Sequence, residues 1–293
     1  MTNDARPRRS VLYMPGSNAR ALEKGKGLGA DALILDLEDA VAPDAKAVAR
    51  AQIGAAVKAG GYGHRELIVR VNGLATPWGR DDLTAACGFA VDAVLLPKVE
   101  NADTVHQAEE LMDGAGAPPG MSIWCMMETP LAMLHAEDIA TAGGRLGGFV
   151  MGTSDLAADL HAAHTRDRLP MITGLGLCIL AARAVGLPIL DGVYLDLEDD
   201  EGFEYACGQG AEFGFDGKTL IHPKQIEAAN KEFAPSADEI EWSRRIIVAH
   251  AEAEKEGQGV LLVDGKLIEN LHVNAAKRLV AMAEAIAAAE GGA

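Results

Sequence analysis

Two acidic residues in this sequence follow apolar runs, at points where buried strands would end. Glu128 comes directly after the run at residues 122–127, and Asp155 comes shortly after the run at residues 148–151. Because the carboxyl ends of neighbouring parallel strands meet at one edge, the two side chains should lie within reach of one cation. Carboxylate oxygens completed by water are the ligands that Mg²⁺ prefers, and Mn²⁺ accepts the same ligands. The pair therefore predicts a magnesium site.

The same two positions allow a second interpretation. The segments "ETPLAM" at residues 128–133 and "SDLAADL" at residues 154–160 both have the composition of a helix start. An acidic side chain there can accept hydrogen bonds from the free N–H groups of the first turn. From spacing alone, metal ligand and helix cap are both open for Glu128 and Asp155.

Polar or charged residues also follow the other apolar runs that we interpret as strands. One such residue is usually a cap or part of a solvated loop, but eight strand ends converging on one rim make a shared site the better explanation. The further members of this series are Asp36, Glu38, Asp39, Arg70, Asn72, Lys98, Asp196 and His222.

The elements that must position these residues alternate along the chain. Ala-rich stretches with apolar residues near a 3.6-residue period, such as residues 44–60 and 101–116, predict helices between the strands. Eight such units match a closed (β/α)8 TIM barrel, and a doubly wound sheet would be expected to carry a GxGxxG turn where this chain has "YMPGSNAR". The predicted strands are residues 10–16, 32–39, 67–73, 93–99, 122–128, 148–155, 189–196 and 218–223.

Composition narrows the class of protein. The chain has 293 residues, 49% of them hydrophobic, and a formal net charge of −17. Such an acidic chain is not expected to coat nucleic acid or an anionic membrane. Four cysteines without a CxxC pair argue against a disulfide framework, and the sequence offers no secretory or membrane-spanning run. We expect a cytoplasmic enzyme.

At the level of motifs, the chain resembles the citrate lyase beta subunit and malyl-CoA lyase family of the HpcH/HpaI aldolase superfamily. The resemblance covers nearly the whole chain, and its compact form is similar to the branch that hydrolyses (3S)-malyl-CoA. It rests on residues 9–46, on "VRVNG", "LLPKVE", "METPLAM" and "GTSDLAADL", and on "GFDGKTLIHPKQI" and "GQGVLLVDGKLIEN".

The resemblance implies roles for several of the residues above. It makes Glu128 and Asp155 the Mg²⁺ ligands and Arg70 a group that contacts substrate. Glu38 and Asp39 would hold the metal's waters. Asp264 would act as the acid/base of a neighbouring subunit's site, so the resemblance also implies a homotrimer or a hexamer.

A coenzyme A ester requires groups that meet its phosphates. The basic residues Arg6, Arg8, Arg9, Arg20, Lys24 and Lys26 gather around the first strand and the helix after it. Arg20 and Lys24 are the stronger candidates because their spacing sets them on one helix face, whereas the earlier arginines could be a solubilising tail. We expect Tyr13, Pro97 and Lys98 to contact the CoA ester as well.

The first expectation for the reaction is a Mg²⁺-dependent carbon–carbon lyase acting on a 3-hydroxyacyl-CoA such as (3S)-malyl-CoA, β-methylmalyl-CoA or citramalyl-CoA. Hydrolysis of (3S)-malyl-CoA to malate and CoA is the alternative, and a citrate lyase subunit working on a carrier-protein substrate comes after it. From other classes, Lys98 could form a Schiff base, or the barrel could bind CoA without catalysis.

The expected domain organisation is a barrel over residues 1–235 and a helical and hairpin extension over residues 236–293. The segment around "LLVDGKLIE" has the strand, turn and strand pattern of a hairpin. We expect this extension to pack on a neighbouring subunit, with packing on its own barrel as the alternative.

Overall fold

The computed structural model describes residues 5–255 and 261–291 of the chain. Its contacts divide the chain into two compact units. One unit comprises residues 8–233, and the other comprises residues 1–7 together with residues 234–293. The two units are described separately below, and the predicted division at residues 235/236 remains a prediction about domains.

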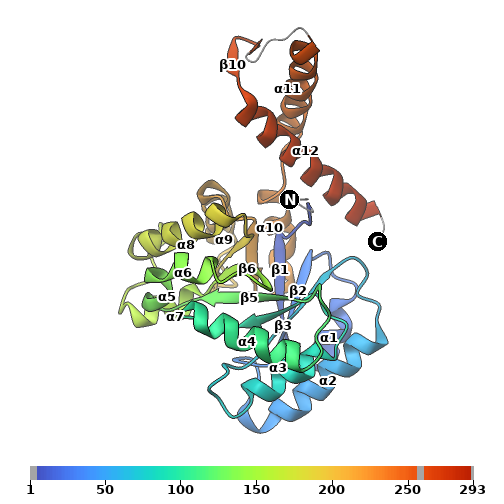
Figure 1. Cartoon of the computed structure of the whole chain (residues 1–293), viewed down its shortest axis with the longest axis vertical. Coiled ribbons are helices and arrows are strands. Elements are labelled where there is room, and N and C mark those ends of the chain that lie inside the picture. The colour runs from blue at the N-terminus through green and yellow to red at the C-terminus, as the bar shows by residue number, and fades with distance from the viewer. Residues whose placement is uncertain (1–4, 256–260, 292–293) are drawn as a thin grey trace. The chain divides into compact units, whose positions relative to one another are not determined.

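The larger unit is a closed barrel of eight parallel strands, as predicted from the apolar runs (Figure 1). Each strand pairs with the next in sequence order, and β1 closes the ring by pairing in parallel with β8. The strands are β1 (Ser10–Pro15), β2 (Ala32–Asp36), β3 (Glu66–Arg70), β4 (Ala93–Leu96), β5 (Ser122–Met127), β6 (Leu146–Met151), β7 (Ile189–Asp191) and β8 (Gly217–Leu220).

Helices surround this barrel, and several of their starts are capped by the residue types that favour such positions. The side chain of Asn101 accepts the N–H of Thr104 at the start of α4, and Thr129 accepts the N–H of Ala132 at the start of α5. The helices are α1 (Ala19–Gly25), α2 (Lys46–Ala59), α3 (Gly79–Cys87), α4 (Ala102–Gly114), α5 (Pro130–Leu134), α6 (Ala136–Ala140), α7 (Thr153–Asp159), α8 (Ile172–Val185), α9 (Asp200–Phe213) and α10 (Ile226–Glu232), with short 3₁₀ turns η1 (Pro43–Ala45), η2 (Leu169–Met171) and η3 (Pro223–Gln225).

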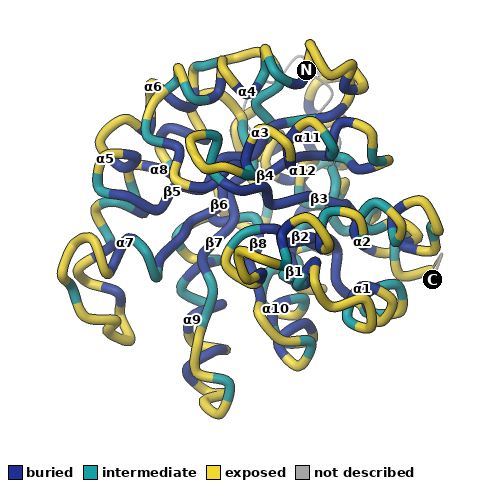
Figure 2. Tube along the Cα trace, turned by 90° about the horizontal axis from the view of Figure 1, so that it is seen from below, coloured by how far each residue is buried: buried dark blue, intermediate teal, exposed yellow. Residues whose placement is uncertain are grey.

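Two apolar layers follow from the alternation of side chains along each strand. In β2, Ala32 and Ile34 belong to the cluster inside the barrel, whereas Leu33 and Leu35 pack in the layer beneath the helices. The same alternation directs Asp36 inward at the carboxyl end of the strand. The strands are the buried centre of Figure 2, and exposed residues lie on the outer helices and loops.

The interior of the barrel is filled by side chains. Trp124 is 1% exposed and lies among the inward residues of the other strands. Gly148 on the neighbouring strand β6 makes room for it, because a Cβ atom at that position would come 2.8 Å from the indole ring. Only the rim of the barrel is therefore open to chemistry.

The predicted seventh strand ends earlier than expected. We expected it to continue to Asp196, but β7 ends at Asp191. Asp191 is fully buried against Lys218 and Arg168, and Gly192 packs so closely on Thr153 that a Cβ atom would lie 2.5 Å from the Thr153 hydroxyl. The chain then leaves the sheet, and Asp196 lies in the following loop, where it accepts the N–H of Glu198.

Arg8 and Arg9 lie at the amino end of β1, opposite the strand ends that carry Glu128 and Arg70. Arg9 makes a forked ion pair with Asp31, and Arg8 pairs with Glu66. The Arg8 guanidinium also lies 5.1 Å from the centre of the Trp124 ring. These two arginines therefore close the floor of the barrel, and the idea that they meet CoA phosphates at the rim is wrong. Arg6 belongs to the other unit.

The smaller unit contains α11 (Ala237–Lys255), the strands β9 (Leu261–Val263) and β10 (Lys266–Ile268), and α12 (Asn270–Gly291). The antiparallel pairing of β9 and β10 is the predicted hairpin, although residues 257–260 of the motif lie outside the described residues. The turn is Asp264–Gly265, and both residues have positive φ, as an Asp-Gly hairpin turn requires.

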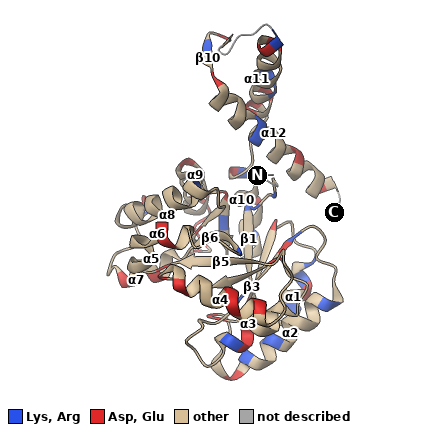
Figure 3. Cartoon of the chain, in the orientation of Figure 1, with Lys and Arg blue, Asp and Glu red and all other residues tan. Residues whose placement is uncertain are grey.

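Charge on the surface is mixed. Figure 3 shows that helices α1 to α4 of the barrel carry both acidic and basic residues. Within residues 5–255 and 261–291, no helix is both long and apolar enough to cross a membrane.

Candidate active site

Arg70 is the centre of the first group of site residues. Its Nε donates to Asp36 Oδ1 at 2.7 Å and its Nη2 donates to Asp36 Oδ2 at 2.6 Å, so the two side chains form a planar fork. Both residues are buried, at 7% and 1% exposure. The parallel pairing of β2 with β3 places them side by side, because Asp36 and Arg70 are register partners.

The acids after β2 complete this group. Glu38 Oε2 lies 2.9 Å from Arg70 Nη1, and Asp39 Oδ2 lies 3.4 Å from the same atom. Tyr13 stacks beneath the guanidinium, with 4.8 Å from its ring centre to Arg70 Cζ. Burial alone would lower the pKa of Arg70, but the hydrogen bond to Asp36 and the nearby negative charges raise that pKa above its ordinary value. Arg70 is therefore a permanently charged group in the mouth of the barrel.

Lys98 joins the two predicted metal ligands. Its backbone N–H donates to Glu128 Oε1 at 2.7 Å, and its Nζ donates to Asp155 Oδ1 at 2.7 Å. Lys98 follows β4 with φ of 49°, a left-handed conformation that is uncommon for a residue with a side chain. Lys98 thus contacts both carboxylates, Glu128 through its backbone and Asp155 through its side chain. A joint role of the two acids as metal ligands stays a prediction.

The two alternatives for these acids can now be compared. Thr129, not Glu128, caps α5, and Glu128 instead points to the Lys98 backbone. Asp155 lies in the first turn of α7 rather than at the end of β6, so an interaction with the helix dipole accompanies its contact with Lys98. Among the described residues, neither acid accepts a capping hydrogen bond at the start of the helix that follows it, and Asp155 keeps only its favourable place in the first turn.

Burial has a large effect on two carboxyl groups of the site. Burial raises the pKa of Glu128 from 4.5 to about 7, with the Lys98 N–H opposing the shift and Glu38 and Asp155 adding to it. Burial likewise raises the pKa of Glu38 from 4.5 to about 7, although Arg70 opposes this. The site holds more negative charge than its own cations neutralise.

This imbalance fits a divalent cation. Within the described residues no three His, Cys, Asp or Glu side chains form a ready cluster, so a metal here would take two protein carboxylates and complete its shell with water or substrate oxygens. Mg²⁺ is usually bound in this way. When all are ionised, five carboxylates stand against Arg70 and Lys98: Asp36, Glu38, Asp39, Glu128 and Asp155.

A support layer fixes the loop that carries Glu38. Lys46, 5% exposed, donates its Nζ to the carbonyl oxygens of Leu37 at 2.8 Å and of Glu38 at 2.7 Å. Asn72 also donates to the Leu37 carbonyl and to Asp82. Asn72 thus lies behind the site as a structural residue, although its place after a strand suggested a site residue.

The hypothesis of a Schiff base at Lys98 loses support. Such a lysine needs a lowered pKa. The hydrogen bond to Asp155, opposed by partial burial, raises the pKa of Lys98. The amine is therefore held protonated at neutral pH.

The remaining predicted residues have other surroundings. Arg20 and Lys24 both belong to helix α1 and are exposed, and Pro97 is buried directly before Lys98. His222 caps η3 by accepting the N–H of Lys224. Asp264 lies in the smaller unit, where it forms a 2.8 Å ion pair with Arg245.

Two features were missed or undervalued in the sequence. Asp36 was recognised as an acid at the end of a strand but not as the residue that orients Arg70. It lies an even number of positions after Ala32 and Ile34, so the alternation of side chains along the strand could have shown that it points into the barrel. The buried triad of Arg168, Asp191 and Lys218 had no signal in a local motif, because its members are far apart in the sequence.

Comparison with known proteins places this geometry in a family. The family model described as HpcH/HpaI aldolase/citrate lyase matches residues 9–223. The chain is 53% identical to a (3S)-malyl-CoA thioesterase of Cereibacter sphaeroides over 288 residues, covering 98% of this chain and 99% of that protein. It is 35% identical to a citrate lyase subunit beta of Leuconostoc mesenteroides, covering 97% and 95%.

Solved structures agree with this assignment. The chain resembles the protein CitE from Mycobacterium tuberculosis in complex with magnesium, acetoacetate and coenzyme A, with a TM-score of 0.76, 29% identity and coverage of 96% and 99%. RipC from Yersinia pestis gives a TM-score of 0.69 at 30% identity, covering 81% and 100%. The (3S)-malyl-CoA thioesterase and the citrate lyase subunit are enzymes, and the present chain is an enzyme of the lyase or thioester hydrolase type. It belongs to the HpcH/HpaI aldolase/citrate lyase family.

Proposed function

We propose that this enzyme hydrolyses (3S)-malyl-CoA to malate and free CoA in a Mg²⁺-dependent reaction. The observation that carries the proposal is the meeting of Glu128 and Asp155 through Lys98 at the rim of the barrel. A carboxylate pair of this kind is suited to a metal that binds a hydroxy acid. The name of the relative at 53% identity supports malyl-CoA as the substrate.

Hydrolysis replaces the carbon–carbon lyase as the first choice. From motifs alone, the lyase was the formal first expectation and the thioesterase its alternative. The relative named a thioesterase matches 98% of the chain at 53% identity, whereas the citrate lyase subunit matches at 35%. Both reactions would use the same proposed metal ligands and the same arginine. We therefore rank hydrolysis first because of the higher sequence identity to the relative named a thioesterase.

The proposed mechanism gives each residue a separate part. Glu128 and Asp155 would hold Mg²⁺, which when bound supplies positive charge to the carboxylate and hydroxyl oxygens of the malyl group. Arg70 would stabilise the negative charge that forms on the thioester oxygen as water attacks its carbon. Asp36 would keep the Arg70 guanidinium in orientation, and Glu38 with Asp39 would orient water near the metal.

Hydrolysis must also move protons. The attacking water loses a proton as its oxygen bonds to the carbonyl carbon, the carbon–sulfur bond then breaks, and the thiolate of CoA takes up a proton. Asp264 is the proposed acid/base for these transfers, supplied by a neighbouring subunit. In a lyase the same group would protonate the enolate carbon of the departing acyl-CoA.

The CoA part of the substrate would contact basic residues outside the metal site. Arg20 and Lys24 are exposed on one helix and, within the described part of the chain, neither has an acidic partner within ion-pair distance. Tyr13, Pro97 and Lys98 remain the proposed contacts to the rest of the ester. The four cysteines are free and buried, which suits the proposed cytoplasmic location.

The second candidate is carbon–carbon cleavage of the same or a related 3-hydroxyacyl-CoA. The resemblance to the CitE complex with magnesium, acetoacetate and coenzyme A favours it. A carrier-protein substrate, as in citrate lyase, comes after both.

One assay separates these functions. The purified chain is incubated with (3S)-malyl-CoA and Mg²⁺ while free thiol and glyoxylate are followed in the same sample. Thiol and malate without glyoxylate support hydrolysis, and glyoxylate with acetyl-CoA and little thiol would replace it with the lyase. Loss of turnover in Glu128→Gln ties the activity to this site.

The subunit arrangement has its own test. If Asp264 completes a neighbouring site in a trimer or hexamer, then Glu128→Gln and Asp264→Asn chains are each inactive alone. Mixing and exchanging their subunits would restore part of the activity, because some interfaces would combine an intact Glu128 with an intact Asp264. No recovery after proven subunit exchange would contradict a shared site.

A further inference from the structure

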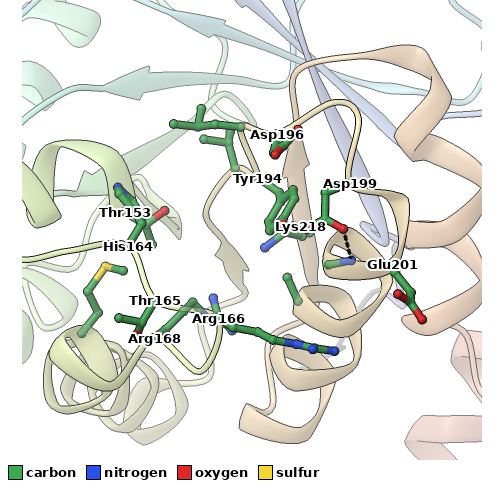
Figure 4. A pocket seen from close by; sticks show the side chains of 15 residues that line it. Thr153, His164, Thr165, Arg166, Arg168, Tyr194, Asp196, Asp199, Glu201 and Lys218 are labelled. Atoms are coloured by element: carbon green, nitrogen blue, oxygen red, sulfur yellow. Dashed lines mark hydrogen bonds between the residues drawn. The ribbon is translucent and has the colours of Figure 1, made fainter.

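A pocket lies beside the candidate active site, on the β7 and β8 side of the barrel (Figure 4). Its volume is about 390 Å³, which is within the usual size range of small-molecule sites. Thr153 lines it and stands two residues before Asp155 in α7, so the pocket and one of the two proposed metal ligands share a helix. Figure 4 shows Lys218 between Thr153 and His164 on one side and Asp199 and Glu201 on the other.

The floor of this pocket carries buried charge. Lys218 Nζ donates to Asp191 Oδ2 at 2.7 Å, and Arg168 Nη1 donates to Asp191 Oδ1 at 2.6 Å. Lys218, Arg168 and Asp191 are 2%, 8% and 0% exposed. Two cations therefore face one anion away from water, where a net positive charge is costly unless another anion balances it.

The two cations also have unused hydrogen-bond donors. An ammonium group has three donors, and within the described residues Lys218 Nζ makes its one hydrogen bond to Asp191. Arg168 Nε donates to Gln209 and Nη1 to Asp191, whereas its buried Nη2 has no hydrogen-bond partner among the described residues. A buried donor of this kind indicates that a group able to accept is missing from the surroundings.

The rim carries acids, but they do not cancel the charge of the floor. Asp196, Asp199 and Glu201 are exposed, so water and salt screen them far more than the buried cations. Asp199 is also engaged, since it accepts the Tyr194 hydroxyl at 2.6 Å and the Gly202 N–H at 2.9 Å. Arg166 adds a positive charge on the same rim.

The rest of the lining is apolar enough for a small carbon skeleton. Met171 and Ala206 are buried walls of the pocket, and Val193 is half-buried. We propose that this pocket binds a small organic carboxylate, with the carboxylate group at Lys218 and the carbon chain against Met171 and Ala206. The inference goes beyond the proposed function, because it concerns a site outside the ring of Arg70, Glu128 and Asp155.

The test uses the full-length protein and succinate as the probe, in buffer containing EDTA so that no metal can hold the acid. Titration calorimetry should detect succinate and should not detect succinamide, which has the same skeleton without charge. Lys218→Met should weaken succinate binding by roughly tenfold or more, because a hydrogen bond to a charged group is lost. This variant leaves Arg168 and Asp191 as a one-to-one pair.

Lys224→Met is the matched control, since Lys224 is an exposed lysine that pairs with Asp200 outside the pocket. It should bind succinate as the wild type does. Equal binding of succinate and succinamide by the wild type would overturn the proposal, and so would unchanged binding in folded Lys218→Met. If Lys218→Met does not fold, Ala206→Met fills the pocket without changing charge, and undiminished succinate binding by that variant contradicts the site.

The carboxylate belongs to a free acid separate from the substrate, because the carboxylate of the malyl group is proposed to lie at the metal. Inhibition of turnover by succinate tests this separation. Noncompetitive inhibition that Lys218→Met relieves supports a separate free acid, and competitive inhibition that the same variant relieves would make the pocket part of the substrate site and overturn the assignment. Inhibition unaffected by Lys218→Met would place succinate elsewhere and overturn the assignment. Direct titration in EDTA does not depend on turnover, so failure of the proposed function would not affect this test.

Discussion

Arg70 and Asp36 form a two-point fork across neighbouring strands, with both nitrogen–oxygen distances below 2.8 Å and both side chains buried. The fork fixes the plane of the guanidinium, which a lysine ammonium could not reproduce. The Arg70 guanidinium is proposed to contact the thioester oxygen. Its orientation therefore depends on Asp36, which lies at the end of the neighbouring strand β2.

The first prediction concerns this fork. Arg70→Lys keeps the charge and loses the planar geometry, so we expect kcat/KM for malyl-CoA to fall by roughly a hundredfold or more. Urea unfolding should show that the variant is folded. Arg50→Lys is the control, because Arg50 pairs with buried Asp82 behind the site. Its replacement should leave kcat/KM for malyl-CoA near the wild-type value. Equal effects of the two replacements would contradict the role of Arg70.

The second prediction concerns pH and the metal-free protein. The pKa of Glu128 is raised from 4.5 to about 7, so the folded state holds this proton more tightly than the unfolded chain does. Stability in EDTA should therefore fall as pH rises from about 4.5 to about 7. Glu128→Gln removes this cost and should be more stable than the wild type at pH 8, by at most roughly 3 kcal/mol.

Urea unfolding of both proteins at pH 5 and pH 8 measures this difference. Mg²⁺ should raise the unfolding midpoint of the wild type and leave that of Glu128→Gln unchanged. A wild type that becomes more stable between pH 5 and pH 8 relative to Glu128→Gln would show that the sign is wrong.

Much of the barrel could be predicted from the sequence because each strand is a local apolar run. The order of the strands was enough to predict that Glu128 and Asp155 lie near one another. The alternation of side chains along β2 was enough to predict that Asp36 points into the barrel. The end of β7 was not, because Val193 and Tyr194 look like strand residues while the burial of Asp191 depends on Lys218 and Arg168, which are distant in sequence. Pairings of that kind carry no local pattern.

The third prediction concerns the close approach of Gly152, which follows β6, to Glu128. A Cβ atom on Gly152 would lie 2.3 Å from Glu128 Cβ and 2.4 Å from Oε2. Gly152→Ala should therefore displace the Glu128 carboxylate and lower both Mg²⁺ affinity and kcat, by roughly tenfold or more. Gly176→Ala is the control, because its Cβ would meet nothing within 4 Å and a helical alanine is favourable. Magnesium titration calorimetry on both variants would show whether the effect is specific.

The fourth prediction concerns the buried triad of Arg168, Asp191 and Lys218 at the floor of the proposed carboxylate pocket. Asp191→Ala leaves Lys218 and Arg168 buried without their anion, and we expect the free energy of unfolding to fall by roughly 3–5 kcal/mol. Burial opposes ionisation of Asp191, but Lys218 and Arg168 outweigh it and lower its pKa below 3.8. Its stabilising effect is therefore complete above about pH 3.8 and is lost only as pH falls through the lower, folded value.

Urea unfolding at pH 7 and pH 5 should give the same large difference between Asp191→Ala and the wild type. Asp200→Ala is the matched control, because Asp200 pairs with Lys224 at the surface with 81% of its side chain exposed, and an exposed pair contributes little to stability. If Asp191→Ala costs no more than Asp200→Ala, the two cations have found other partners. The floor of the pocket would then lack the fixed charge on which the carboxylate site depends.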